Sequence, residues 1–371
     1  MGFFLLYNMN VTEAFNQRNF LIQRSDFTTE SHKDLIKAIL KKHGEEDQNI
    51  LEIKIIDDNE DYDSFFVKTV NTSLCIKISF DDVPIYYEHL ILRGIANLSI
   101  SPIAYERNEI FWGKNIYYTI SSFEFSNNLH TLGINSILLP EYNNFNENLK
   151  KLHSVELPDE LLPYLDDMES YLNYQKINFD NILKYVEMKE VKDYEYMKKL
   201  YLEIHEETMN LYEANKSKIV LKNLVHGKLD SKTIIENSGY FKFLNFENAF
   251  VGSCLFDIAS LVLELNMNNL KEFDFVTNKI NSLQFTEKKF RSQKLIDEYK
   301  ICKSFLIRKK MLDVIRDYIK EIIIYNSERI DKIVKISNDF SKHFYRFCNI
   351  DAVNRNKDGL VNKLITNQMK D

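Results

Sequence analysis

The sequence of 371 residues has only nine glycines, five prolines and four cysteines. Cys75, Cys254, Cys302 and Cys348 show neither a CxxC motif nor the spacing of metal ligands, so we interpret them as reduced core thiols of a cytoplasmic protein. No apolar run approaches the roughly 20 residues of a membrane-spanning helix, which predicts no membrane span. The apolar residues 3–7 are too few for a signal peptide and follow no basic region.

The chain has no excess of positive charge, since 48 Lys and Arg residues stand against 55 Asp and Glu residues and the net charge is −7. This balance argues against a general binder of nucleic acid. No Walker A, HExxH, GxSxG or dinucleotide-binding motif occurs, and the eight histidines lack zinc-ligand spacing. The hydrophobic fraction of 44% and the charged fraction of 28% are ordinary for a globular protein, and the length allows one large domain or two lobes.

The first third of the chain alternates between helical and strand patterns. Helix-capping residues at 28–31 and Gly44 bound a predicted helix over 34–42. A second helix, over 85–92, has Pro84 in its first turn and stops at Gly94. Alternating or β-branched runs predict five strands, at 50–56, 65–70, 74–80, 103–105 and 116–120.

The second half is mostly helical, with one interruption. Helical spacing covers residues 158–222 and again 258–350. Between them, Leu224–Asp257 predicts a hairpin: an apolar run ends at Gly227, and strands at 233–236 and 240–246 flank a turn at 237–239. Asp257 comes directly before the next helix.

The hairpin region resembles the active-site core of the aminoglycoside phosphotransferase and choline kinase-like family. The matching residues, with their order and spacing, are His226, Gly227, Leu229, Phe246, Glu247 and Asp257. The predicted order of three strands, a helix and two strands is also that of a kinase N-lobe. The resemblance implies an α+β, two-lobed protein kinase-like fold with a small antiparallel β-sheet N-lobe and a mainly helical C-lobe.

We therefore expect three regions. Residues 1–45 are an N-terminal extension with one helix, 46–125 form the N-lobe, and 126–371 form the helical C-lobe that contains the hairpin 224–257. The hinge between the lobes is expected near Phe123–Asn128.

The resemblance also assigns roles to single residues. Lys77 matches the third-strand lysine that contacts nucleotide phosphates, and Glu88 matches the helix carboxylate that fixes that lysine. An exposed strand lysine without such a role is the alternative. His226, Gly227 and Asp257 are expected to be structural, with Asp257 bracing the loop through backbone hydrogen bonds. His153, in a predicted helix end over 145–155, is also interpreted as structural.

Three positions depart from the family pattern. Lys228 stands at the catalytic Asp position, Thr233 at the metal-binding Asn position and Asn245 at the metal-binding Asp position. A protonated lysine cannot accept a proton from an acceptor hydroxyl, and Mg²⁺ prefers an anionic oxygen to an amide. The loop 57–64, where a phosphate-covering loop is expected, has five acidic residues and no glycine.

Two hypotheses follow. The first is a pseudokinase that binds an unknown small molecule or protein partner without transferring phosphate. The alternative is a divergent ATP-dependent phosphotransferase acting on an alcohol group, with Asp230 as the relocated base, Glu247 as the metal ligand, and ATP and Mg²⁺ as cofactors. A turn-capping role is the competing interpretation of Asp230.

Overall fold

The structure, a computed structural model, is described for part of the chain. The described residues are 29–58, 62–79, 82–113, 115–123, 127–128, 143–156, 169, 170, 173, 176, 180, 194–237, 240–265, 267, 269–282 and 292–324. Cys348, residues 124–126 of the expected hinge, the hairpin turn at 238–239 and most of the helices expected over 158–193 lie outside these residues. So does the predicted helical region after residue 324.

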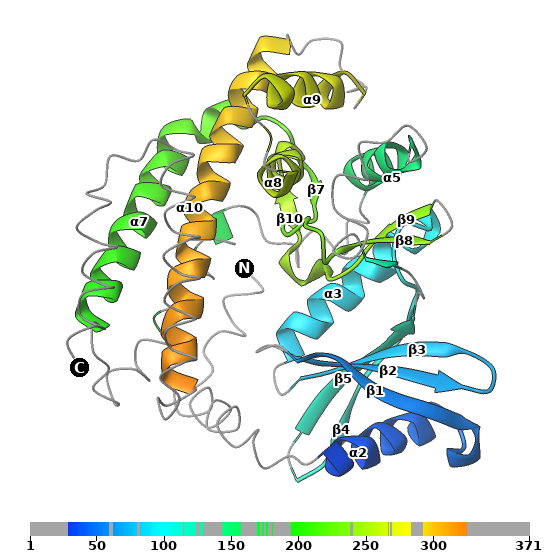
Figure 1. Ribbon diagram of the computed structural model, residues 1–371. Coiled ribbons are helices and arrows are strands. Elements are labelled where there is room, and N and C mark those ends of the chain that lie inside the picture. Colours follow the sequence, from blue (N-terminus) through cyan, green and yellow to red (C-terminus); the bar gives the residue numbers. More distant parts are fainter. Residues whose placement is uncertain are drawn as a thin grey trace.

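An antiparallel five-stranded sheet forms the N-lobe (Figure 1). Its strands, in the spatial order β1-β2-β3-β5-β4, are β1 (Ile50–Asp58), β2 (Asp63–Thr69), β3 (Ser73–Ser79), β5 (Asn115–Ser122) and β4 (Ala104–Phe111). All five predicted strands are confirmed. β4 is longer than the predicted 103–105, because this edge strand is half exposed and carries polar residues that hide its pattern.

Two helices cover the faces of the sheet. α2 (Thr29–Lys42) packs Leu35, Ile36, Ile39 and Leu40 against the inner residues of the strands. α3 (Asp82–Gly94) lies on the opposite side, as Figure 1 shows, and joins the core beneath the hairpin. The helix of the expected N-terminal extension therefore shares its core with the N-lobe sheet.

The second lobe is mainly helical, as predicted. Its helices are α5 (Asn143–His153), α7 (Tyr194–Asn215), α8 (Leu255–Leu265), α9 (Asn269–Ser282) and α10 (Ser292–Ile324). α7 and α10 lie side by side in Figure 1, and both contribute buried residues to a core that also contains α8. Short 3₁₀ turns occupy Asp47–Asn49, Ala96–Leu98, Lys216–Lys218 and Phe246–Asn248. Over the described helices, none is both long and apolar enough to cross a membrane.

The hairpin lies between the two lobes in the ribbon view. β8 (Ile234–Asn237) pairs with β9 (Tyr240–Phe243), and β6 (Asn127–Asn128) adds to the free edge of β8. A second small sheet, β7 (Asn223–Val225) with β10 (Phe250–Gly252), was not predicted.

The predicted end of the second hairpin strand at Phe246 is wrong. β9 ends at Phe243, because Asn245 takes a left-handed backbone conformation with φ of 63° and starts the 3₁₀ turn. Asparagine tolerates this conformation better than most residues.

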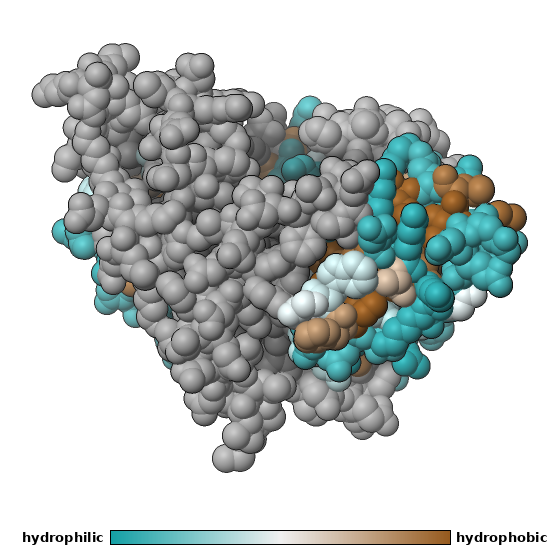
Figure 2. Space-filling model, turned by 90° about the horizontal axis from the view of Figure 1, so that it is seen from below, coloured by the Kyte–Doolittle hydropathy of each residue, from teal (hydrophilic) through white to brown (hydrophobic). Residues whose placement is uncertain are grey.

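Figure 2 views the molecule from below, where the coloured surface shows hydrophobic and hydrophilic groups interspersed. Large hydrophobic side chains of the edge strands are among those exposed in the N-lobe, including Leu51, Ile55 and Ile56 of β1 and Phe111 of β4. Exposed apolar side chains of this kind are common on soluble domains and do not by themselves define a site.

Candidate functional site

The loop that follows β7 is held from below by Asp257. Asp257 lies in the first turn of α8 and is 1% exposed. Its Oδ2 accepts a hydrogen bond from the backbone N–H of His226 at 2.8 Å, and its Oδ1 accepts one from Gly227 at 3.1 Å. His153 Nε2 lies 2.9 Å from the same Oδ2. The backbone hydrogen bonds expected of Asp257 are therefore present, and His153 is a buried partner of this brace.

His226 fixes the other side of the loop. Its ring is buried against Phe246, with ring centroids 4.7 Å apart, and its Nε2 donates to the carbonyl oxygen of Leu244 at 2.8 Å. Burial lowers the pKa of His226, although the nearby Asp257 carboxylate acts in the opposite direction. The lowered pKa keeps the imidazole neutral at physiological pH. His226 thus ties the loop to the strand end that leads to Asn245.

Gly227 allows the close approach that this arrangement needs. Its φ is +78°, and a Cβ there would lie 2.0 Å from the carbonyl oxygen of Asn248. Only glycine fits both the left-handed backbone and this contact.

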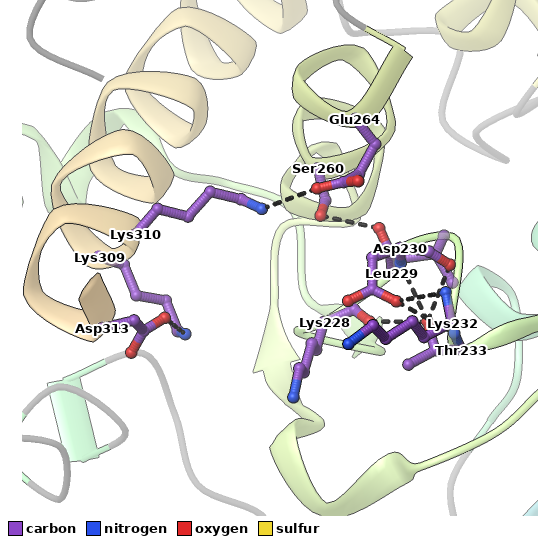
Figure 3. Close-up of polar contacts among 10 residues, drawn as sticks. All are labelled: Lys228, Leu229, Asp230, Lys232, Thr233, Ser260, Glu264, Lys309, Lys310 and Asp313. Carbon is purple, nitrogen blue, oxygen red and sulfur yellow. Dashed lines mark hydrogen bonds and ion pairs between the residues drawn. The ribbon is translucent and has the colours of Figure 1, made fainter. Parts of the chain in front are cut away.

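Lys228, at the position of the expected catalytic carboxylate, has an exposed side chain. Figure 3 shows it extending from the loop on the side that faces α10. Its backbone carbonyl accepts a hydrogen bond from Thr233 Oγ1 at 2.9 Å. The structure therefore offers a cation, and no carboxylate, at the catalytic Asp position of the family motif.

Asp230 and Thr233 close the loop on itself (Figure 3). Asp230 Oδ1 accepts hydrogen bonds from the backbone N–H groups of Lys232 at 2.8 Å and Thr233 at 3.0 Å. In return, Thr233 Oγ1 accepts one from the N–H of Asp230 at 2.9 Å. This is the turn-capping geometry that competes with a catalytic role for Asp230. Thr233 is 1% exposed, and its hydroxyl forms hydrogen bonds with the loop backbone instead of facing a possible metal site.

Lys77 and Glu88 form the ion pair that the sequence predicts. Lys77 Nζ lies 2.6 Å from Glu88 Oε2, and both residues are buried. The other oxygen of Glu88 accepts the backbone N–H of Phe246 at 3.2 Å, which links α3 to the hairpin. The alternative, that Lys77 is an exposed lysine on a strand surface, does not hold because Lys77 is only 8% exposed.

This pair stays charged although it is buried. Burial opposes the ammonium, but the Glu88 carboxylate together with smaller contributions from Tyr62, Glu247 and Cys75 outweighs it and holds the pKa of Lys77 well above its ordinary value. For Glu88, burial raises the pKa, because it disfavours the carboxylate, while Lys77 and the Phe246 N–H stabilise the ionised form. At a separation of 2.6 Å we take the pair as ionised at neutral pH.

Two further residues surround the Lys77 ammonium. Asn245 Oδ1 accepts a hydrogen bond from Lys77 Nζ at 3.1 Å, so the amide oxygen at the metal-ligand position faces a cation of the protein itself. The ring of Tyr62, next to β2, lies with its centroid 4.2 Å from the same Nζ. The ammonium therefore has two oxygen acceptors and an aromatic face around it.

Tyr62 also reaches Glu247. The Tyr62 hydroxyl donates to Glu247 Oε1 at 3.3 Å, which connects the start of β2 to the 3₁₀ turn after Asn245. Glu247 Oε2 is buried and has no hydrogen-bond partner. Tyr62 was not predicted as a site residue, because the sequence places it in the acidic loop 57–64. The one available signal was an aromatic residue directly before a buried strand.

A nucleotide with its metal ion does not fit these donors as they are arranged. Thr233 is committed to the loop and Asn245 to Lys77, whose ammonium also lies against the ring of Tyr62. Over the described residues, no three His, Cys, Asp or Glu side chains come together in a group that could hold a metal ion.

Comparison with solved structures shows the fold. An ethanolamine kinase of Plasmodium vivax aligns with 86% of this chain and 89% of its own, with a TM-score of 0.58 at 15% identity. The choline kinase LicA of Streptococcus pneumoniae aligns with 85% of this chain and 99% of its own, with a TM-score of 0.54 at 14% identity. The spectinomycin phosphotransferase APH(9)-Ia aligns with 84% of this chain and 93% of its own, with a TM-score of 0.53 at 12% identity.

The chain thus has a two-lobed protein kinase-like fold. Within that class, it is the fold that choline kinases and aminoglycoside phosphotransferases share, as the motif resemblance predicts. In sequence, no family model and no curated protein matches the chain. Identities of 12–15% show a shared architecture and leave the activity to be argued from the site.

Proposed function

We propose that this chain is a pseudokinase, a binding protein on the choline kinase-like fold that transfers no phosphate. The observation that carries the proposal is the environment of Lys77. Its ammonium is already surrounded by Glu88, Asn245 and the ring of Tyr62. To hold phosphate oxygens, the ammonium would have to give up Asn245 or the Tyr62 ring and rebuild its solvation.

The catalytic loop supports the same proposal. Phosphoryl transfer relies on a carboxylate that orients the acceptor hydroxyl and on metal ions that neutralise the phosphates. Lys228 is a cation at the carboxylate position, and Asp230, two residues later, caps the turn through Oδ1. The loop keeps the backbone arrangement set by Asp257 and Gly227, so its shape is retained without the usual chemical groups.

A divergent phosphotransferase is the second candidate, and one observation favours it. The Oε2 atom of Glu247 is buried without a hydrogen-bond partner, two residues after Asn245. A buried carboxylate oxygen in this state is a natural ligand for a divalent cation. On this hypothesis Glu247 supplies the negative charge that Asn245 lacks, and Asp230 serves as the base through its second oxygen.

Release of labelled phosphate from ATP separates the two candidates. The full-length protein is incubated with γ-labelled ATP and Mg²⁺, alone and with small alcohols such as choline, ethanolamine and an aminoglycoside. We expect no release or transfer above that of the Asp230→Asn/Glu247→Gln variant. Turnover by the wild type that both Asp230→Asn and Glu247→Gln abolish would establish the divergent enzyme instead.

A further inference from the structure

The loop that carries Lys228, residues 226–233, is called the Lys228 loop. Two contacts through α8 hold it at a fixed place relative to α10. Ser260 Oγ on α8 donates to the carbonyl oxygen of Leu229 at 2.8 Å. One turn further along α8, Glu264 Oε1 lies 3.2 Å from Lys310 Nζ on α10. Figure 3 shows this frame, with the loop on one side and α10 on the other. The loop and α10 therefore present their side chains to each other on rigid supports.

α10 carries two cations that share one carboxylate on this side. Lys309 Nζ lies 2.7 Å from Asp313 Oδ2, and Arg316 Nη1 lies 3.2 Å from Asp313 Oδ1. Although burial acts against it, these two cations, with a smaller contribution from Lys228, lower the pKa of Asp313 to about 2. Figure 3 shows the side chain of Lys228 on the side of the loop that faces Lys309 and Asp313 of α10.

Positive charge exceeds negative charge in this group. Its cations are Lys228, Lys232, Lys309, Lys310 and Arg316, and its carboxylates are Asp230, Glu264 and Asp313. The excess of two positive charges contrasts with the net charge of −7 for the whole chain.

Lys228 is the member of the group whose charge is unused. Its side chain is exposed, and no hydrogen bond or ion pair with another described residue engages its ammonium. The side chains of Asp313 and Arg316 are 25% and 22% exposed, so a solute can reach the same side of α10.

We propose that Lys228, together with Arg316 of α10, binds the phosphate group of a small molecule. The inference rests on the proposed binding function and names the class of its ligand. A phosphate monoester carries a charge of about −1.5 to −2 at neutral pH, which matches the excess charge of this group. Lysine supplies a mobile point charge, and arginine supplies a planar fork for phosphate oxygens. The lysine that removes the family's catalytic carboxylate thus gives the same position affinity for an anion.

Calorimetric titration at low ionic strength tests the proposal with two sources of the group: inorganic phosphate and glycerol 3-phosphate. Acetate, a monoanion, is the third probe. We expect saturable binding of at least one phosphate probe at millimolar concentration, and weaker binding of acetate. Lys228→Ala should weaken phosphate binding by at least about tenfold, which is the loss expected for one charge-assisted contact. Tighter binding of the ester than of inorganic phosphate identifies a phosphorylated small molecule as the ligand.

Lys222→Ala is the matched control, because Lys222 is an exposed lysine a few residues earlier in the chain. It removes the same charge and should leave phosphate binding unchanged. An unchanged unfolding midpoint of Lys228→Ala without ligand excludes loss of the fold. The proposal is overturned if neither phosphate probe binds, or if Lys228→Ala binds phosphate as the wild type does. Either result leaves the pseudokinase proposal standing, which only turnover of ATP contradicts.

Discussion

Single residues set the geometry of the loop that carries Lys228 and of the group around Lys77, which consists of Glu88, Asn245 and Tyr62. Gly227 admits the carbonyl of Asn248, and Asp257 accepts the two backbone N–H groups at the start of the loop. In the N-lobe, Glu88 and Asn245 both accept hydrogen bonds from Lys77. Each of these contacts is buried or half-buried, so its loss should be measurable as stability.

Gly227→Ala should destabilise the fold more than the same change at Gly113. Both glycines have positive φ, +78° and +72°, but only at Gly227 does a Cβ meet another atom, at 2.0 Å. The left-handed backbone alone costs about 1–2 kcal/mol for a residue with a side chain. Chemical denaturation should show about that loss for Gly113→Ala, and at least about 2 kcal/mol more for Gly227→Ala. Equal losses at the two positions would contradict the close contact with Asn248.

The Lys77–Glu88 pair should behave as a buried ion pair in a double-mutant cycle. Lys77→Met or Glu88→Gln leaves one buried group without its partner, and each should cost roughly 3 kcal/mol of unfolding free energy. The double variant should cost clearly less than the sum, because no unpaired charge remains. Urea unfolding of the four proteins measures this, and simple additivity would argue against a direct coupling.

The family motif is sufficient to predict some of these residues but not others. His226, Gly227 and Asp257 sit at fixed spacings in the chain, and Lys77 and Glu88 follow from the order of a strand and a helix. Tyr62 could not be predicted in the same way. Its contact with Lys77 depends on the register in which β2 pairs with β3, and the packing of the whole sheet sets that register.

Elements hold these residues through few but specific contacts. α8 carries Asp257 for the loop, Ser260 for the Leu229 carbonyl and Glu264 for α10. α10 was predictable as helical from its spacing, while its pairing with α7 and α8 was not. β4 was only partly predicted, because an edge strand needs few apolar residues, and β7 with β10 form strands too short to show a pattern.

Asp313 should give α10 a stability that depends on acid pH. Its pKa is lowered from 3.8 to about 2 in the folded protein, so the stabilisation is complete above pH 3.8 and disappears as pH falls through about 2. The full effect is about 2 kcal/mol. Asp313→Asn should therefore be less stable than the wild type at pH 6, and the difference should shrink towards pH 2 in denaturant unfolding curves.

Asp297→Asn, on an exposed part of the same helix, is the control for this prediction. The Asp297 and Lys300 side chains are 55% and 68% exposed and 3.7 Å apart, so this change should alter stability little at any pH. A difference between wild type and Asp313→Asn that stays constant from pH 6 to pH 2 would show that the Asp313 charge is not what stabilises α10.

Over the whole molecule, the fold is that of a kinase, whereas the residues at the motif positions argue against phosphate transfer. The order of strands and helices belongs to the kinase-like architecture that the solved structures share. The Lys77–Glu88 pair and the hydrogen bonds of Asp257 match what the motif resemblance implies. The groups that would handle phosphate and metal are replaced, at Lys228, Thr233 and Asn245, or covered, at Lys77. The sequence was sufficient for the architecture because patterning determines it, and it could not show the covering of Lys77, which arises from tertiary packing.

Calorimetric titration of the wild type with ATP and Mg²⁺ tests the central claim most directly. Because Asn245 and the ring of Tyr62 cover the ammonium of Lys77, which Glu88 holds in place, we predict no saturable binding that depends on Lys77 at millimolar ATP. Any weak heat should match that of inorganic phosphate and disappear in Lys228→Ala. Saturable ATP binding that a folded Lys77→Met variant loses, and that Lys228→Ala retains, would contradict the account.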